Sequence, residues 1–323
     1  MKSIKTSILF CFGVFLLVTI TFYSCKKKQT EPIEGVSIYY SSMQDFIDKN
    51  GVKKETFTID AAIGGSFISV KGTTVNIPAN AFKDSVGNVI TGIINFEFKD
   101  IYKKSEMILS DMATNCDTGP MLSAGEFFLK ASQNNLKFVS TKTITILQPT
   151  PGLISANMGP FYLKPDSTNQ TNWDWFGSPG SFPLPYGGLN YSAQTYAYSI
   201  FPNYFSSSGN PNPTHWYNTD DPYAFSSYPQ TTLTIINPDN SFQPFVYLIF
   251  NSVNSAVRVY NTGGYFYNFA PVGLQATVFA IAIKDNKLYS SIIPITISSG
   301  QIITLNLKLN STADLTTSLK ALD

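Results

Sequence analysis

Few residues in this sequence could carry out nucleophilic, acid–base or metal chemistry. The chain has one histidine, His215, and three cysteines, Cys11, Cys25 and Cys116. These are too few to build a Cys/His metal cluster, and a Cys-His dyad outside the N-terminal segment would have to combine Cys116 with His215. The sequence contains no nucleophile elbow, P-loop or dinucleotide-binding fingerprint. We therefore predict a protein that is not an enzyme and that uses no cofactor and no metal.

Carboxylates leave one catalytic alternative open. Glycoside hydrolysis needs two carboxyl groups at a suitable separation, and Asp174 with Asp220 or Asp221 could supply them. The adjacent pair Asp220-Asp221 stands before Pro222, an arrangement more typical of a turn. A carboxylate-dependent glycoside hydrolase is thus a distant alternative.

An aromatic segment gives the strongest compositional signal for binding. Between Trp173 and Tyr228 the chain has 16 aromatic residues and three charged ones, among many Gly, Pro, Ser and Asn. In one interpretation the rings form a flat surface for a sugar or a protein partner, with polar contacts beside them. In the other they are the core of a loop-rich insert. The candidate binding residues are Trp173, Trp175, Trp216, Tyr217, Asn218 and Asp220.

The N-terminus predicts export and a lipid anchor. Lys2 and Lys5 precede an apolar run from Ile8 to Tyr23, which ends at Ser24-Cys25. This is the pattern of a signal peptide over residues 1–24, and Ser24-Cys25 resembles a bacterial lipobox in which Cys25 receives the lipid. Residues 25–40 would then be a lipid-anchored tether. The remaining chain, 323 − 24 = 299 residues, is nearly neutral with a single arginine, so we expect a membrane partner through the lipid and no nucleic-acid partner.

Alternating apolar and polar residues predict β-structure on both sides of the aromatic segment. Residues 41–150 would form one β-sandwich domain, residues 151–229 an aromatic loop-rich insert, and residues 230–323 a second sandwich of immunoglobulin or transthyretin type. Short helices are expected near 43–47, ended by Asn50-Gly51 as a left-handed cap, and at 313–322. The charged stretch 101–111 is expected to be a solvated sheet edge. The predicted fold class is therefore all-β, with two sandwich domains after a lipoprotein signal peptide.

The first domain also resembles a known family. Gly64-Gly65 followed by Ile77-Pro78-Ala79-Asn80-Ala81-Phe82 is similar to the ZU5 pattern of a double glycine and an IPxxAF segment. The match is closer to a group of uncharacterised Bacteroidota lipoproteins that share the block around 98–108 and Leu122–Glu126. Trp216-Tyr217-Asn218-Thr219-Asp220 also resembles a Trp-x-Asn-x-Asp element of that group. ZU5 modules join proteins to partners, which implies a binding role. Their self-cleavage at a His-Phe step does not carry over, because His215 lies outside the module.

These observations predict a lipid-anchored cell-envelope protein with a non-catalytic binding or structural role. The alternative is a surface lipoprotein that binds glycans through 173–228, so the partner would be a protein or a glycan. The anchor would hold the protein to the outer membrane, and both the periplasmic and the surface face remain open.

Overall fold

The computed structural model describes residues 39–116, 119–149, 155, 157–163, 173–175, 187–192, 195–203, 205–208, 214–261 and 263–323. For 173–175 and 187–192 it describes the backbone alone. Strands dominate these ranges, which confirms the predicted all-β class. The helices described are α2 (Met43–Asn50), α3 (Lys104–Leu109) and α4 (Thr312–Lys320), and none of them is long and apolar enough to cross a membrane.

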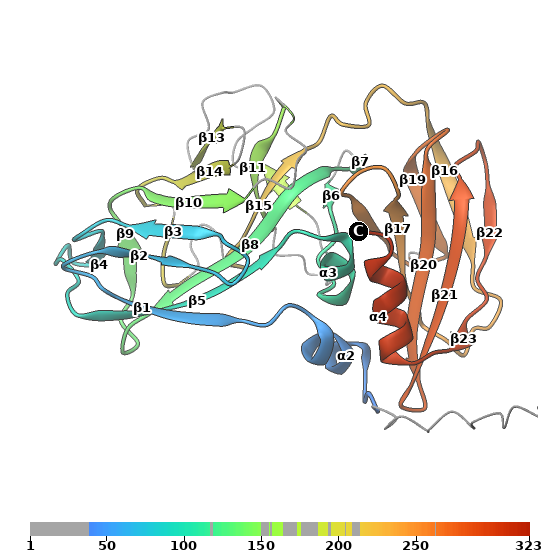
Figure 1. The fold of residues 1–323 in the computed structure, drawn as a ribbon, viewed down its shortest axis with the longest axis horizontal. Coiled ribbons are helices and arrows are strands. Elements are labelled where there is room, and N and C mark those ends of the chain that lie inside the picture. Colours follow the sequence, from blue (N-terminus) through green and yellow to red (C-terminus); the bar gives the residue numbers. More distant parts are fainter. Residues whose placement is uncertain are drawn as a thin grey trace, which may run out of the picture. The chain divides into compact units, whose positions relative to one another are not determined.

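Two sheets enclose the first hydrophobic core (Figure 1). The larger has the strand order β1-β5-β8-β15-β11-β12-β6-β7, and the facing one has the order β13-β14-β10-β3-β2. The larger sheet consists of β1 (Glu55–Asp60), β5 (Ile93–Ile101), β6 (Asn115–Cys116), β7 (Gly119–Pro120), β8 (Leu122–Ser132), β11 (Gly159–Leu163), β12 (Trp173–Trp175) and β15 (Trp216–Asp221). The facing sheet consists of β2 (Gly65–Ile68), β3 (Thr74–Ile77), β10 (Ile144–Pro149), β13 (Gly187–Ser192) and β14 (Thr195–Ile200). A small pair, β4 (Phe82–Asp84) and β9 (Phe138–Ser140), lies beside them.

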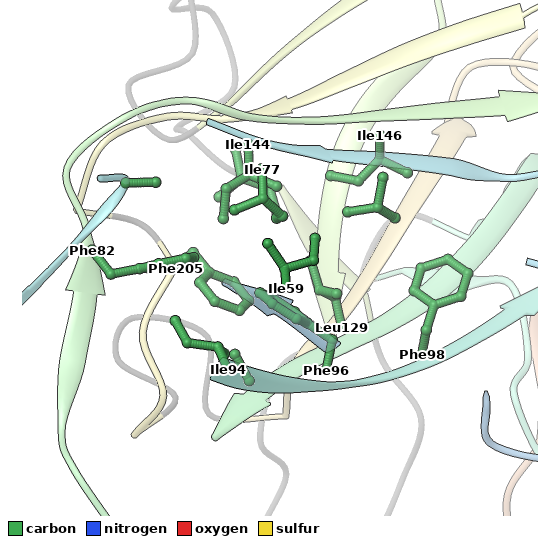
Figure 2. Packing of buried hydrophobic residues seen from close by; sticks show 14 of the residues in the cluster. Ile59, Ile77, Phe82, Ile94, Phe96, Phe98, Leu129, Ile144, Ile146 and Phe205 are labelled. Atoms are coloured by element: carbon green, nitrogen blue, oxygen red, sulfur yellow. The ribbon is translucent and has the colours of Figure 1, made fainter. Parts of the chain in front are cut away.

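The alternation of the sequence explains this core. Every second residue of β10 is buried, and in β5 the buried residues Ile94, Phe96 and Phe98 alternate with more exposed ones. Figure 2 shows Phe96 and Leu129 of the larger sheet pointing towards Ile144 and Ile77 of the facing sheet. The β-structure that the alternation predicted for this part of the chain is thereby confirmed.

A second pair of sheets encloses a separate core near the C-terminus. One has the order β19-β16-β22 and the other the order β18-β17-β20-β21-β23. Their strands are β16 (Gln230–Ile236), β17 (Phe245–Phe250), β18 (Ala256–Val259), β19 (Tyr265–Pro271), β20 (Gln275–Lys284), β21 (Lys287–Thr296), β22 (Ile302–Thr304) and β23 (Lys308–Leu309). Leu233 of β16 and Leu248 of β17 belong to this core. The β-structure predicted for this part of the chain is confirmed.

The three helices pack together in a third core that joins the two groups of sheets. Phe46 of α2, Met107 of α3 and Leu315 of α4 share it with Tyr247 of β17 and Phe279 of β20 (Figure 1). The predicted solvated edge at 101–111 is therefore wrong. Its centre is the helix α3, and Lys104 is buried there because its ammonium donates to the carbonyl of Phe250 at 3.0 Å.

Two further expectations need correction. Ser42 caps the start of α2, but Gly51 at its C-terminal end has φ −66°, so the expected left-handed cap does not form. The expected absence of regular elements in the aromatic segment is also wrong for the described residues. The strands β12 to β15 lie within it, and β14 and β15 pair with β10 and β8 of the first sandwich. The segment thus completes the first two sheets.

Candidate functional site on strand β15

Strand β15 carries four of the six candidate binding residues. It lies between β8 and β11 in the large sheet, with Trp216 opposite Phe128, Tyr217 opposite Phe127 and Asn218 opposite Glu126. Side chains alternate along a strand, so Trp216 and Asn218 lie on one face of the sheet and Tyr217 on the other. The side chains on the two faces of β15 therefore have different surroundings.

Tyr217 belongs to the core of the first sandwich. Its side chain is 1% exposed, and its ring stacks on Phe127 with centroids 5.0 Å apart and planes at 12°. Tyr198 packs against both rings edge-on. For Tyr217 the core interpretation of the aromatic segment therefore holds, since a ligand has no access to this ring.

Trp216 lies on the opposite face, in a row that runs across three strands. Lys99 of β5 pairs with Phe128 of β8, and Phe128 pairs with Trp216 of β15. The rings of Phe128 and Trp216 are 5.5 Å apart and tilted by 59°. The ammonium of Lys99 lies 6.0 Å from the Trp216 ring, within range of a cation–π interaction. Because the rings are tilted, Trp216 and Phe128 do not form one flat surface.

This row lines an open pocket of about 380 Å³, which we call the Trp216 pocket. Its walls come from the end of α2, the following segment with Lys53 and Lys54, the residue after α3, and the outer faces of β5, β8 and β15. Trp216 and Phe128 are both half-buried, so parts of their rings remain accessible. Glu97 of β5 also lines the pocket and forms a 2.8 Å ion pair with Lys54.

The electrostatics of the pocket are set by its lysines. Partial burial and the nearby ammonium of Lys54 lower the pKa of Lys99 below its usual value, and Lys53 adds to this effect. The charges of Asp48 and Glu97 act in the opposite direction but do not cancel it. Among the charged residues that line the pocket, the lysines Lys53, Lys54 and Lys99 outnumber the carboxylates Asp48 and Glu97 by one.

Asn218 and Asp220 belong to a buried polar group beside this pocket row. Both side chains are fully buried, and Asn218 Nδ2 donates to Asp220 Oδ2 at 2.6 Å while Ser123 Oγ donates to Asn218 Oδ1 at 3.3 Å. Glu126, opposite Asn218, is also fully buried. Neither carboxylate oxygen of Glu126 has a hydrogen-bond partner among the described residues. The same is true of Oδ1 of Asp220.

Burial changes the protonation of this pair. It raises the pKa of Glu126 well above the usual value, and the carboxylate of Asp220 raises it further. Burial likewise raises the pKa of Asp220, against the opposing effect of hydrogen bonds from Ser123 and Asn218. Two neighbouring buried carboxyl groups cannot both ionise cheaply, so burial and the charge of Asp220 favour the protonated form of Glu126. Since Asp220 has no exposed surface, a glycosidase mechanism that uses it would need the site to open.

The residues considered for catalysis, in the Cys-His dyad and in the carboxylate pair, lie on or next to strands of the same large sheet. Cys116 on β6 is separated from β15, and so from neighbouring His215, by β11 and β12. Three strand spacings of about 4.8 Å keep these two residues beyond hydrogen-bond distance. Asp174 on β12 lies two strands from β15. Asp220 and Asp221 end strand β15, so the predicted turn begins only after them. Asp221 accepts from Ser155 Oγ at 2.5 Å and from the Tyr223 backbone N–H at 2.8 Å.

Three of the predicted site residues remain without a described side chain. Trp173 and Trp175 lie on β12, where the backbone alone is described, and Cys25 lies outside the described residues. Among the residues whose structure is described, no group of three or more His, Cys, Asp or Glu side chains is placed to hold a metal ion.

Sequence reasoning missed Lys99, Phe128 and Glu126. The adjacent pair Phe127-Phe128 could have given a signal, because two successive apolar residues in a strand indicate that both faces of the sheet are covered. Comparison of the chain with protein-family models, curated proteins and solved structures finds no match. The resemblance to ZU5 modules therefore stays a prediction.

Proposed function

We propose that this chain is a lipid-anchored cell-envelope protein that binds a ligand without catalysis, through the Trp216 pocket. The observation that supports binding is the half-exposed Trp216 ring, which lines an open pocket beside Phe128 and Lys99. Tryptophan combines a large apolar surface with a hydrogen-bonding edge, and binding sites use it for that reason.

The lipid anchor rests on the sequence around Cys25. A charged start, an apolar run and Ser24-Cys25 together support export and lipid attachment at Cys25. The protein would then face either the periplasm or the cell exterior from the outer membrane. The ZU5-like module is part of this proposal, and so is the division into two sandwich domains, the first of which includes strands β11 to β15 and the second of which begins at residue 230.

In the glycan alternative the sugar would bind in the same pocket, but it would contact fewer of the predicted residues. Of the four residues on β15, Tyr217, Asn218 and Asp220 are buried, and Trp216 alone among them lines the pocket. A glycan would therefore stack on Trp216 rather than on a flat surface made of several rings.

The test of binding uses full-length protein in detergent and a panel of envelope polysaccharides and oligosaccharides. We expect at least one glycan to bind, Trp216→Ala to abolish its binding while changing the melting temperature little, and an exposed control outside the pocket, Phe266→Ala on β19, to bind normally. A Trp216→Ala protein that melts far lower, with no ligand found for the parent, would show that this ring has a structural role only.

The test of anchoring is independent of the ligand. Mass spectrometry of the protein from membranes should find a lipid on Cys25, and Cys25→Ser should release the protein from the membrane fraction. An unmodified Cys25 in membrane-bound protein would exclude the lipoprotein assignment.

A further inference from the structure

Lys99 is the pocket lysine whose ammonium has no anionic or carbonyl partner in the described part of the chain. Lys54 is paired with Glu97 at 2.8 Å, and Lys53 donates to the carbonyls of Asp48 and Lys49 at the end of α2. Among the described residues, the contact found for the Lys99 ammonium is the Trp216 ring at 6.0 Å.

This arrangement is electrostatically unbalanced. Lys99 is half-buried, so its ammonium has lost part of its water, and the charges of Lys54 and Lys53 lie nearby. A partly desolvated cation is stabilised when an anion approaches it. The pocket is open, so the anionic group of a ligand can reach the Lys99 ammonium, for which the described residues provide no anionic partner.

The other groups of the pocket suit a ligand with many hydroxyl groups. Val52 N–H donates to Ser110 Oγ at 3.0 Å, which leaves the Ser110 hydroxyl hydrogen free to be donated. The carboxylates of Asp48 and Glu97 can accept hydrogen bonds from hydroxyl groups. A simple inorganic anion would use none of these acceptors and would gain nothing from the Trp216 ring. A volume of about 380 Å³ lies at the lower end of the range for small-molecule sites.

We propose that the Trp216 pocket binds an anionic sugar, with the sugar ring against Trp216 and its carboxylate or phosphate at the ammonium of Lys99. This inference rests on the proposed binding function and adds the charge and the chemical class of the ligand. A hexuronate and a phosphorylated hexose share the required chemistry, and the experiment separates them.

The experiment titrates the full-length protein in detergent with four probes by isothermal calorimetry. They are a galacturonic acid disaccharide, the matching neutral galactose disaccharide, galactose 6-phosphate and inorganic phosphate. The variants are Lys99→Met, which removes the charge, Lys99→Arg, which retains it, and Lys83→Met on β4 as a matched control at an exposed site.

We expect an acidic sugar to bind and the neutral disaccharide to bind more weakly. Lys99→Met should weaken the acidic sugar about 10- to 100-fold, the typical effect of losing a charged hydrogen bond, and should leave the neutral one unchanged. Lys99→Arg should retain most of the affinity, and Lys83→Met all of it. If the galacturonic acid disaccharide binds more tightly than galactose 6-phosphate, the preferred anion is a carboxylate. If galactose 6-phosphate binds more tightly, it is a phosphate.

Three results would overturn the inference. They are equal affinity for acidic and neutral sugars, an affinity for acidic sugars that survives Lys99→Met, and inorganic phosphate binding as tightly as galactose 6-phosphate. If neutral glycans bind as tightly as acidic ones and depend on Trp216, this inference fails while the proposed function stands. If no glycan in the wider panel depends on Trp216, the proposed function fails as well.

Discussion

Glu126 of β8 lies directly opposite Asn218 of β15, fully buried and without a hydrogen-bond partner among the described residues for either carboxylate oxygen. Its pKa is raised by burial and then by the neighbouring Asp220 carboxylate. The folded protein therefore keeps a proton that the unfolded chain releases. Stability must fall as the pH rises from the unfolded pKa towards the folded one, because the unfolded state then binds fewer protons.

Glu126→Gln should remove this pH dependence. Below the pKa of an ordinary glutamate, about 4.3, the variant and the parent should have similar free energies of unfolding, since both are neutral at this position. Above it the variant should become the more stable of the two, by about 1.4 kcal/mol for each pH unit up to the folded pKa. Urea unfolding at several pH values measures this difference.

A control at another glutamate makes the test specific. Glu55→Gln changes a residue that is not fully buried, and its effect should stay within about 0.5 kcal/mol across the same pH range. If Glu126→Gln destabilises the protein equally at every pH, Glu126 has a partner in solution that the structure does not show.

Neighbouring residues Trp216 and Tyr217 should differ sharply in their importance for stability. Tyr217→Ala leaves a cavity between Phe127 and Tyr198, and we expect a loss of about 3–5 kcal/mol. Trp216→Ala exposes a face that is already half-open, and we expect about 1–2 kcal/mol. Chemical denaturation of both variants checks the ranking, and the reverse order would place the Trp216 ring in a core.

Glycine is required at position 125 both by the backbone conformation and by the atoms packed around it. Its φ is +132°, and a Cβ at this position would lie 2.4 Å from Cε1 of Tyr102. Gly87 has a comparable φ of +92° with nothing within 4 Å of an added Cβ. Gly87→Ala should therefore cost only the backbone strain, about 1–3 kcal/mol, and Gly125→Ala clearly more. Equal melting temperatures for the two variants would show that the Tyr102 ring moves aside freely.

Arg258 connects the second sandwich to the segment that follows α3. Its guanidinium pairs with Asp111, lies 3.5 Å from the centroid of the Phe245 ring and donates to Tyr247 Oη at 3.1 Å. Arg258→Ala should cost about 3–5 kcal/mol, as expected for removing one partner of a buried ion pair. Arg258→Lys should recover only part of this loss, because an ammonium cannot reproduce a planar guanidinium against aromatic rings. Full recovery of the unfolding free energy by lysine would show that charge alone matters here.

The sequence predicted strands well where one face of a sheet is buried, as in β5 and β10, because alternation then reports burial directly. It failed at α3, where charged residues suggested a solvated edge although Lys104 is buried against a carbonyl from the second sandwich. That contact joins residues 146 positions apart, which no local pattern reveals. The site was predicted only in part, because a local sequence pattern does not show which residues pair across strands. Trp216 was recognised by its type, whereas Lys99 and Glu126 become notable only through the strands opposite them.

The pairing of β8 with β15 has a consequence for how the chain reaches this structure. Ser123 and Asn218, joined by a hydrogen bond, are 95 residues apart, and the first sandwich cannot close before the aromatic segment has been delivered. Contacts of such long sequence separation slow folding, because a large loop must be ordered first. While the chain folds, the side of β8 that pairs with β15 stays unpaired until Trp216–Asp221 reaches it. Substitutions that delay this pairing would then reduce the yield of folded protein even where the stability of the finished fold is unchanged.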